Sequence, residues 1–512
     1  MNKLIKNRGL LFSLGSLAVL SGCAEQTQEL EKPNIVFIFA DDMGYGDVSA
    51  LNENSKIQTT NIDRIANEGV IFTDAHSSSS VSTPSRYSVL TGRYNWRSTM
   101  KSGVLGGYSK ALIPQDQRTI AGVLREQGYQ TACIGKWHLG WDWNNIDAGI
   151  DSVDFSKPIM NGPTTLGFDY FYGISGSLDM APYVYVENDK PTALPDRITS
   201  NTGMAFWRKG PTASDFDHEQ TLPNLINRAV NYIHDKSKEQ KPFYLYLPLP
   251  APHTPILPIP EYQGKSGLNP YGDFVLMVDD MVGKVMKALD DAGISDNTIL
   301  VFSTDNGCSP EARFEELQAK GHYPSYIYRG HKADLFDGGH RIPCVVRWPA
   351  KIKPHTVGQT VCLTDFFATF AAVADYRLKD TEGEDSYNML PLLLNEQEAD
   401  VIREATVHHS IDGDFTIRKG EWKLLLSPGS GGWSFPRTGK DDEVIKTLPS
   451  VQLYNMETDP EEAQNVYAEH PEIVKELRDL MIKYIKEGRS TPGTPQKNDG
   501  PEVWKQLSWM EE

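Results

Sequence analysis

The sequence predicts an α/β protein in which helices flank a large, mixed, mostly parallel sheet. Continuous apolar runs of strand length occur at 34–40, 243–247 and 297–303. Such runs are typical of strands that are buried on both faces of a parallel sheet. Helical spacing of apolar residues at 220–237 and 273–292 separates these runs, as expected where helices cover the sheet.

The carboxyl end predicts a second, smaller layer. An acidic stretch around 375–400 is followed by strand-like segments at 405–411, 415–426 and 451–454, and then by a helix from Pro471. This order favours a small antiparallel sheet packed with one helix. We therefore expect a catalytic domain at 33–375 and a C-terminal subdomain at 376–512.

The first residues predict an export signal. Residues 1–22 carry three basic residues and then a short apolar run, which is typical of a signal peptide. The run ends Leu20-Ser21-Gly22-Cys23, which resembles a bacterial lipoprotein signal, and residues 23–32 would be a tether. We expect lipid on Cys23, anchorage without a spanning helix, and a periplasmic or cell-surface location.

The charge excludes one class of partner. The 512 residues carry a formal net charge of -18. An acidic exterior repels polyanions, so we expect no nucleic-acid binding. An anionic substrate would need a local cluster of positive charge.

Two predicted strands end in oxygen-bearing side chains. Asp41 and Asp42 follow the first strand, while Asp305 and Asn306 follow the strand at 297–303. Ligand sites in open α/β sheets lie at the carboxyl ends of strands. Oxygen ligands without Cys or His favour Ca²⁺ or Mg²⁺ over zinc.

Ser82 is a candidate nucleophile. It stands in Ser82-Thr83-Pro84-Ser85-Arg86, and Pro84 suits the first turn of a helix. The free N–H groups of that turn favour an anion, and Arg86 can face the same point. By itself the segment also suits a capped surface helix.

Further candidates follow other strands. Lys136 and His138 alternate after a strand-like segment, so both side chains point to one side of an extended chain. His253 is held among prolines, and Lys332 lies in a glycine-rich loop.

Together these features resemble the formylglycine-dependent sulfatases of the alkaline phosphatase superfamily, in their bacterial serine-type form. The motifs are Ser82-x-Pro84-Ser85-Arg86 followed by Leu90-Thr91-Gly92, Gly135-Lys136-Trp137-His138-Leu139-Gly140, and Asp305-Asn306-Gly307. The resemblance implies an alkaline-phosphatase-like fold, and Ca²⁺ rather than Mg²⁺ held by Asp41, Asp42, Asp305 and Asn306.

The resemblance also implies catalytic roles. A maturation enzyme would oxidise Ser82 to formylglycine, whose hydrate supplies the attacking oxygen. Arg86 would orient that hydrate, Lys136 and Lys332 would hold sulfate oxygens, and two histidines would move protons: His138 during release of sulfate and His253 to the departing alcohol.

The remaining segments favour a saccharide substrate. Aromatic, serine and acidic residues are concentrated between Gly173 and Glu187, and Trp433 follows a flexible glycine segment that could form the rim of a pocket. His408 and His409 are candidate substrate contacts, although packing or turn roles also fit them. We expect an exo-acting carbohydrate O-sulfatase, with galactose or N-acetylgalactosamine as the sugar.

Two other functions remain open. A phosphoester or phosphonate hydrolase could use the same fold, although two-zinc enzymes of the superfamily need more His and Asp ligands. An unmodified Ser82 would leave a non-catalytic lipoprotein that binds sulfated glycan.

Overall fold

The computed structural model describes residues 32–396 and 400–511. The predicted signal peptide, Cys23 and all of the tether except Lys32 lie outside the described residues. Within the described part, no helix is both long enough and apolar enough to cross a bilayer. Residues 32–512 form one compact unit, and the boundary expected near residue 375 stays a prediction.

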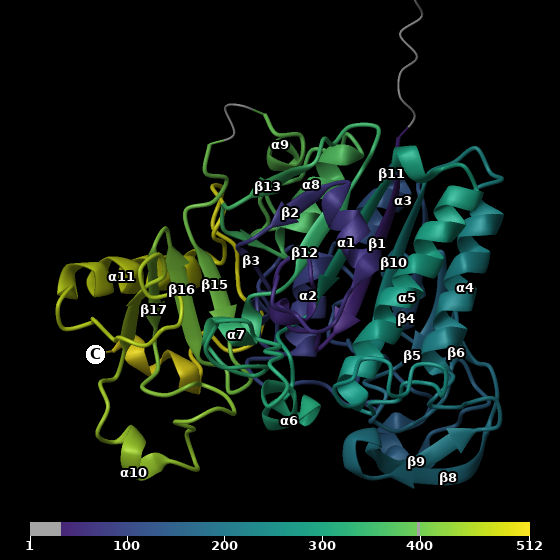
Figure 1. Cartoon of the computed structure of the whole chain (residues 1–512), viewed down its shortest axis with the longest axis horizontal. Helices are drawn as coiled ribbons and strands as arrows, with labels where there is room; N and C mark the ends of the chain where they lie inside the picture. The colour runs from purple at the N-terminus through teal and green to yellow at the C-terminus, as the bar shows by residue number, and fades with distance from the viewer. Residues whose placement is uncertain (1–31, 397–399, 512) are drawn as a thin grey trace, which may run out of the picture. The chain divides into compact units, whose positions relative to one another are not determined.

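A ten-stranded sheet runs through the larger part of the chain (Figure 1). Its five central strands, from β11 to β5, are parallel, while β12, β6 and β7 add antiparallel pairs. This confirms the predicted mixed, mostly parallel sheet. In spatial order the strands are β13 (His355–Val357), β2 (Val70–Phe72), β12 (Cys344–Arg347), β11 (Thr298–Thr304), β1 (Asn34–Asp41), β10 (Phe243–Pro252), β4 (Gln130–Lys136), β5 (Tyr170–Ile174), β6 (Val186–Glu187) and β7 (Lys190–Pro191).

Alternate side chains of β1 enter two different cores. Val36 and Ile38 pack with α1 (Thr60–Asn67), α4 (Thr221–Lys236) and α5 (Pro270–Asp291). Phe37 and Phe39 pack on the other face with α2 (Ser82–Thr91), α3 (Ile120–Glu126) and α8 (Asp365–Val373). Because successive side chains of a strand point to opposite faces, an entirely apolar run is what a sheet covered on both sides requires.

The C-terminal part confirms the smaller antiparallel sheet. Its strands are β15 (Thr406–His409), β16 (Phe415–Lys419), β17 (Trp422–Leu425) and β18 (Gln452–Asn455), and α11 (Pro471–Glu487) packs on them. The segment 415–426, which the sequence presents as a single run, is a hairpin. Gly420 turns the chain with a φ of 56°, a conformation that glycine adopts without strain.

Shorter elements complete the chain. These are β3 (Ala75–His76) paired with β14 (Val361–Cys362), the hairpin of β8 (Pro195–Asn201) and β9 (Trp207–Ala213), and the helices α6 (Phe314–Gln318), α7 (Asp337–His340), α9 (Leu390–Leu393) and α10 (Asp442–Ile445).

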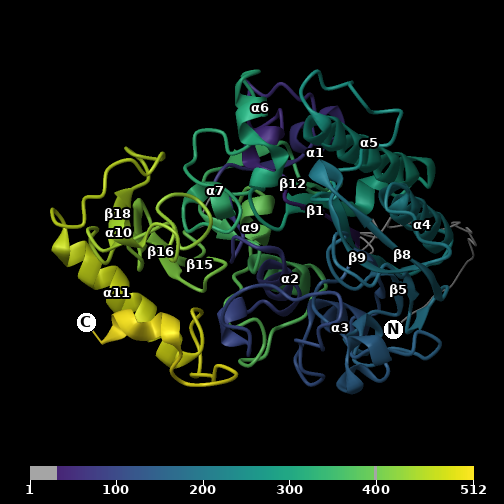
Figure 2. The ribbon, with the colours of Figure 1, turned by 90° about the horizontal axis from the view of Figure 1, so that it is seen from below.

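The C-terminal sheet contacts the segment that precedes α2. Figure 2 shows β15 as the strand of that sheet nearest to α7 and the large sheet. The main-chain oxygen of His409, in β15, accepts hydrogen bonds from Ser80 N at 3.0 Å and Ser79 Oγ at 2.8 Å. Strand β15 therefore holds the serine run that leads into Ser82.

Candidate active site

Ser82 is the first residue of α2 and is almost completely buried. Its Oγ donates to Asp41 Oδ1 at 3.1 Å, and Lys136 Nζ donates to Ser82 Oγ at 3.3 Å. Pro84 lies in the first turn, where its missing N–H leaves no partner unsatisfied. The serine thus lies between a carboxylate and an ammonium group at a helix N-terminus.

The four oxygen-bearing residues predicted at the strand ends come together. Strands β1 and β11 are parallel and in register up to Ala40 and Thr304, so their ends lie side by side. The N–H of Asp42 donates to Asp305 Oδ1 at 3.2 Å, and Asn306 Nδ2 donates to Asp42 Oδ1 at 2.7 Å. We call Asp41, Asp42, Asp305 and Asn306 the strand-end cluster; all four are buried.

Three cations neutralise the carboxylates of this cluster. Lys136 Nζ lies 2.6 Å from Asp41 Oδ2, and Lys332 Nζ lies 2.7 Å from Asp42 Oδ2. An Arg86 guanidinium nitrogen lies 2.8 Å from Asp305 Oδ2. Buried charges persist only when they are paired in this way.

These ion pairs also determine the protonation states of Asp41 and Lys332. Burial alone would raise the pKa of Asp41, but Lys136, His253 and Arg86 hold it well below its usual range. Burial opposes the charge on Lys332, yet Asp42 and Asp41 raise the pKa of Lys332 above its ordinary value. Asp41 and Lys332 are therefore both ionised at neutral pH.

The strand-end cluster also has the donor set of a divalent metal site. Asn306 Oδ1 is buried and has no hydrogen-bond partner among the described residues. An unpaired buried acceptor is costly, and a cation would satisfy it. Ligand atoms of Asp41, Asp42 and His253 also lie within 4.8 Å of one another. Carboxylate and amide oxygens of this kind suit Ca²⁺ or Mg²⁺.

The two predicted catalytic histidines are held by backbone carbonyls. His138 Nε2 lies 2.7 Å from the oxygen of Leu105, so Nε2 carries the proton and Nδ1, which has no partner, can accept one. Burial, with Lys136 and Arg86, lowers the pKa of His138 well below its usual value. His253 Nδ1 contacts the oxygen of Thr254, and its Nε2 lies 3.6 Å from Asp42 Oδ2.

These side chains border a cavity of about 430 Å³. Four of the predicted residues line it: Ser82, His138, His253 and Lys332. Arg86, Lys136 and the strand-end cluster are not among its lining residues. Lys136 and Asp41 contact Ser82, and Asp42 lies beside Lys332 and His253. The cavity therefore presents a serine, an ammonium group and two imidazoles to a ligand.

The cavity wall contains further residues. Ser177 and Asp179 come from the stretch that the sequence marked as saccharide-binding, and Trp433 comes from the predicted rim. Arg208 and Glu311 also line the cavity and were missed. Arg208 lies on the β8–β9 hairpin, for which the sequence analysis found no signal.

His408 and His409 do not line this cavity. His409 is buried, and its Nδ1 lies 2.9 Å from Asn95 Nδ2. His408 Nδ1 lies 2.8 Å from the oxygen of Ser77, and its Nε2 lies 3.1 Å from Thr406 Oγ1. The geometry thus gives the predicted substrate contacts no support; His408 is packed against His340 of α7 and His76 of β3, and His409 against Asn95 and Phe415.

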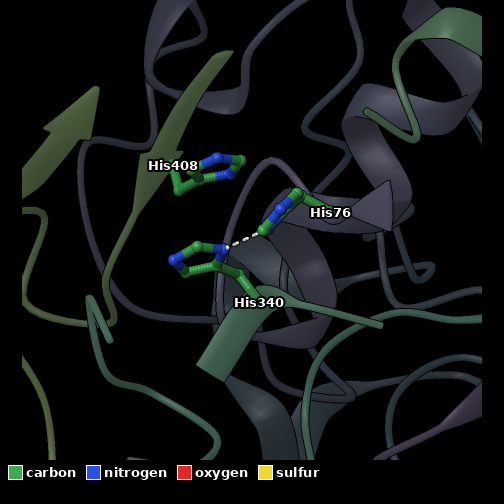
Figure 3. Close-up of side chains that lie close together, drawn as sticks. All are labelled: His76, His340 and His408. Carbon is green, nitrogen blue, oxygen red and sulfur yellow. Dashed lines mark hydrogen bonds between the residues drawn. The ribbon is translucent and has the colours of Figure 1, made fainter. Parts of the chain in front are cut away.

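His408 belongs to a cluster of three buried histidines, which we call the histidine trio (Figure 3). His76 and His340 share a hydrogen bond between their Nδ1 atoms at 2.9 Å, and the ring of His408 stacks on that of His340 at 4.0 Å. Figure 3 shows the stacked rings beside the shared hydrogen bond.

The trio is a packed hydrogen-bond network. The outer nitrogens of His76 and His340 contact Asp74 Oδ1 at 2.8 Å and the oxygen of Leu335 at 3.0 Å. With the contacts of His408, every ring nitrogen of the trio has a partner. The stacked rings and the neighbouring ammonium group of Lys423, 3.3 Å from His340 Nε2, disfavour a metal ion here.

Comparison with known proteins shows which family the chain belongs to. A family model described as Sulfatase matches residues 33–376. The chain is 34% identical to N-acetylgalactosamine-6-O-sulfatase of Bacteroides thetaiotaomicron, over 92% of this chain and 98% of that protein. It is 30% identical to human arylsulfatase A, over 88% and 87% of the two chains.

A solved structure gives the same result. A protein from a study of glycosaminoglycan metabolism by Bacteroides thetaiotaomicron superposes with a TM-score of 0.77 at 33% identity, over 88% of this chain and 99% of that chain. The family match spans the large sheet and all the cavity-lining residues described above except Trp433. The chain belongs to the sulfatase family and is a sulfuric ester hydrolase.

Proposed function

We propose that this protein removes a sulfate group from the end of a saccharide chain, with N-acetylgalactosamine or galactose as the sulfated sugar. One observation carries the proposal: Ser82, Lys332, His138 and His253 line a single cavity behind which the strand-end cluster lies. The 34% identity to an N-acetylgalactosamine-6-O-sulfatase supports the choice of sugar.

The cavity suits a chain end. A volume of about 430 Å³ has room for one sugar ring and its sulfate, but not for several rings of a polymer. The net charge of -18 also disfavours a long groove for a sulfated polymer. An exo-acting enzyme follows from both.

The nucleophile in this proposal is Ser82 after oxidation to formylglycine by a maturation enzyme. The hydrated aldehyde supplies one hydroxyl that attacks sulfur and a second whose deprotonation releases sulfate. Lys136 holds this residue through a direct contact with Ser82 Oγ, and Arg86 is fixed to Asp305 one helical turn further on. Their positive charges also oppose the negative charge that develops in the transition state.

The other residues act on the substrate. The ammonium group of Lys332 attracts sulfate oxygens. His253 keeps its Nδ1 on the oxygen of Thr254, so protonated Nε2 can give its proton to the departing alcohol. Neutral His138, with Nδ1 free, can take the proton whose loss releases sulfate.

The strand-end cluster would hold a calcium ion, which would balance the negative charges of substrate and carboxylates. The unpaired Asn306 Oδ1 supports this choice of site. We also propose, from the sequence of residues 1–23, that the protein is an exported lipoprotein anchored through Cys23. Labelling with a fatty acid should fail for Cys23→Ala.

The test is peptide mass spectrometry across residues 81–86 on protein from a host with a serine-oxidising maturation enzyme, followed by desulfation assays. We expect loss of two hydrogen atoms at Ser82. We also expect sulfate release from 6-sulfated N-acetylgalactosamine or galactose, but not from Ser82→Ala. Unmodified Ser82 together with no sulfate release from any sulfated galactoside would overturn the proposal.

A further inference from the structure

One wall of the cavity is built from two segments that are tied together. The main-chain oxygen of Asp179, between β5 and β6, accepts hydrogen bonds from Arg208 N at 3.1 Å, an Arg208 guanidinium nitrogen at 3.2 Å and Tyr183 OH at 3.0 Å. The Arg208 guanidinium also contacts Asp179 Oδ2. Three donors on one carbonyl fix the position of Asp179 before any ligand binds.

This wall has unpaired polar atoms. Asp179 Oδ1 and Ser177 Oγ are buried and have no hydrogen-bond partner among the described residues. Asp179 is 6% exposed and Ser177 is 2% exposed, yet both line the cavity. Leaving such atoms unpaired costs free energy. A ligand that brings hydrogen-bond donors would remove this cost.

The charge of the wall differs from that around Ser82. Arg208 and Asp179 neutralise each other, and the Arg208 side chain is 53% exposed at the cavity mouth. Elsewhere in the cavity lining, which includes Ser82, the ammonium group of Lys332 supplies a positive charge that attracts an anion. The paired charges of the wall suit a neutral group that both donates and accepts hydrogen bonds.

We propose that Ser177, Asp179 and Arg208 form a hydroxyl-recognition site for the sulfated sugar, which requires a free hydroxyl and rejects a second sulfate at that ring position. This inference rests on the proposed function. The hydroxyl would donate to Asp179 Oδ1, and Arg208 and Ser177 would donate to sugar oxygens. Phe206, at the mouth beside Arg208, offers an apolar face to the ring.

Rejection follows from the same contacts. A sulfate ester at this position has no proton to donate to Asp179, and it brings a negative charge next to a buried carboxylate. A deoxy sugar leaves Asp179 Oδ1 unpaired and is penalised in the same way. The site would therefore reject sugars that carry a second sulfate at this ring position.

The test compares kcat/KM for N-acetylgalactosamine 6-sulfate with analogues that are deoxygenated or sulfated at O3 or O4. For the wild type we expect one ring position, O3 or O4, at which the deoxy analogue and the sulfated analogue both have a lower kcat/KM than the parent sugar. The decrease should be about 10- to 100-fold, as expected for the loss of one hydrogen bond to a charged group. In Asp179→Asn, kcat/KM for the parent sugar should fall by about the same factor. Its preference for the parent over the disulfated sugar should fall at least about tenfold.

Two further variants protect this test against misfolding. Arg208→Gln, at the exposed mouth, should lower kcat/KM for the parent but still reject the disulfated sugar, because Asp179 remains. Asp196→Asn is the matched control: Asp196 is an exposed carboxylate on β8, paired with Arg197 at 3.0 Å, and its loss should change nothing. Inhibition by inorganic sulfate reports on anion binding near Lys332. It should be equal in the wild type and the three variants.

The outcomes separate the two proposals. If the wild type releases no sulfate from any sugar, the proposed function fails. If it releases sulfate but Asp179→Asn keeps the wild-type preference among the analogues, the hydroxyl-recognition site is wrong and the proposed function stands. Equal wild-type rates on parent and disulfated sugars would also overturn the site.

Discussion

The strand-end cluster and the histidine trio are two groups of buried, titratable side chains with opposite hydrogen-bonding states. Among residues 32–396 and 400–511, Asn306 Oδ1 of the cluster has no hydrogen-bond partner, and His138 Nδ1 beside the same cavity has none either. In the trio, each ring nitrogen has a partner within hydrogen-bonding distance. The cluster lies next to a cavity, whereas the trio is packed between β3, α7 and β15.

This difference distinguishes side chains that bind a ligand from side chains that only stabilise the fold. A side chain that must bind something keeps an atom unpaired and tolerates the cost, whereas a structural side chain satisfies every donor and acceptor. Residue type alone does not distinguish the two, because a histidine and a carboxylate lie side by side in both regions: His253 beside Asp42, and His76 beside Asp74. The predictions below test the contrast from the largest expected effect to the smallest.

Ser82→Ala should have the largest effect on activity. Removal of the nucleophile should lower kcat by at least about 10³-fold, while the thermal midpoint changes little. Ser88→Ala is a matched control on the same helix, where the hydroxyl bonds Ser78 Oγ at 2.7 Å. It should lower stability and keep activity. Steady-state kinetics with thermal unfolding measure both; equal activity losses would contradict the assignment.

Removal of divalent cations should have the next largest effect. Without a cation, Asn306 Oδ1 keeps no hydrogen-bond partner among the described residues. We expect a chelator to abolish most activity and lower stability by about 2.7 kcal/mol relative to a cation at 100 times its Kd. Calcium should restore both. Full activity after dialysis against chelator, with elemental analysis showing no bound cation, would refute the site.

Two buried lysines, one beside the strand-end cluster and one beside the histidine trio, allow a direct comparison of the two regions. Lys332 Nζ lies 2.7 Å from Asp42, and Lys423 Nζ lies 2.7 Å from both Asp337 and Glu462 beside the trio. Lys332→Met should lower kcat/KM by about 10- to 100-fold. In the part of the chain that the structure describes, Lys423→Met leaves Glu462 without a cation and Asp337 with Arg341 alone, at 3.2 Å, and should cost about 3–5 kcal/mol of stability, with kcat per folded molecule retained.

Urea unfolding and active-site titration measure the two quantities for these lysine variants. The reverse result, with activity lost at Lys423 and stability lost at Lys332, would remove the distinction between the regions.

The smallest effect is the dependence of stability on pH. Burial lowers the pKa of His76, His340 and His408 in the folded protein. The unfolded chain therefore binds protons first as pH falls below about 6.5, and stability is lost from there downward. Each histidine contributes up to about 1.4 kcal/mol per pH unit.

His408→Gln should flatten this profile between pH 7 and pH 5. The exposed variant His234→Gln, on α4, is the control and should follow the wild type. Thermal midpoints across this pH range report the result, and a wild-type slope in His408→Gln would show that His408 is not one of the responsible groups.

Much of the fold could be predicted from the sequence, because a strand that is buried on both faces is a continuous run of apolar residues. Continuous apolar runs predicted β1, β10 and β11, and their carboxyl ends located the strand-end cluster. The hairpin at Gly420 was less visible, since one apolar segment contains both of its strands.

The cavity wall was only partly predictable. Asp179 lies in a segment rich in aromatic residues and Trp433 follows a flexible glycine segment, and these compositions predicted that both segments contribute to the pocket. Arg208 lies in an exposed hairpin, and contacts with Asp179 and Tyr183, distant in sequence, bring it to the cavity. His408 and His409 lie away from the cavity lining because the end of β15 points their side chains into the protein, and sequence does not say which neighbour covers them.

The hydrogen bonds from Ser79 and Ser80 to His409 have a consequence for the time course of synthesis. They join residues about 330 positions apart, so the ribosome must finish most of the chain before the loop ahead of Ser82 can lock into place. Until then Ser82 is part of an open segment. An enzyme that needs to grasp this peptide has its opportunity during that interval, and the docking of β15 closes it.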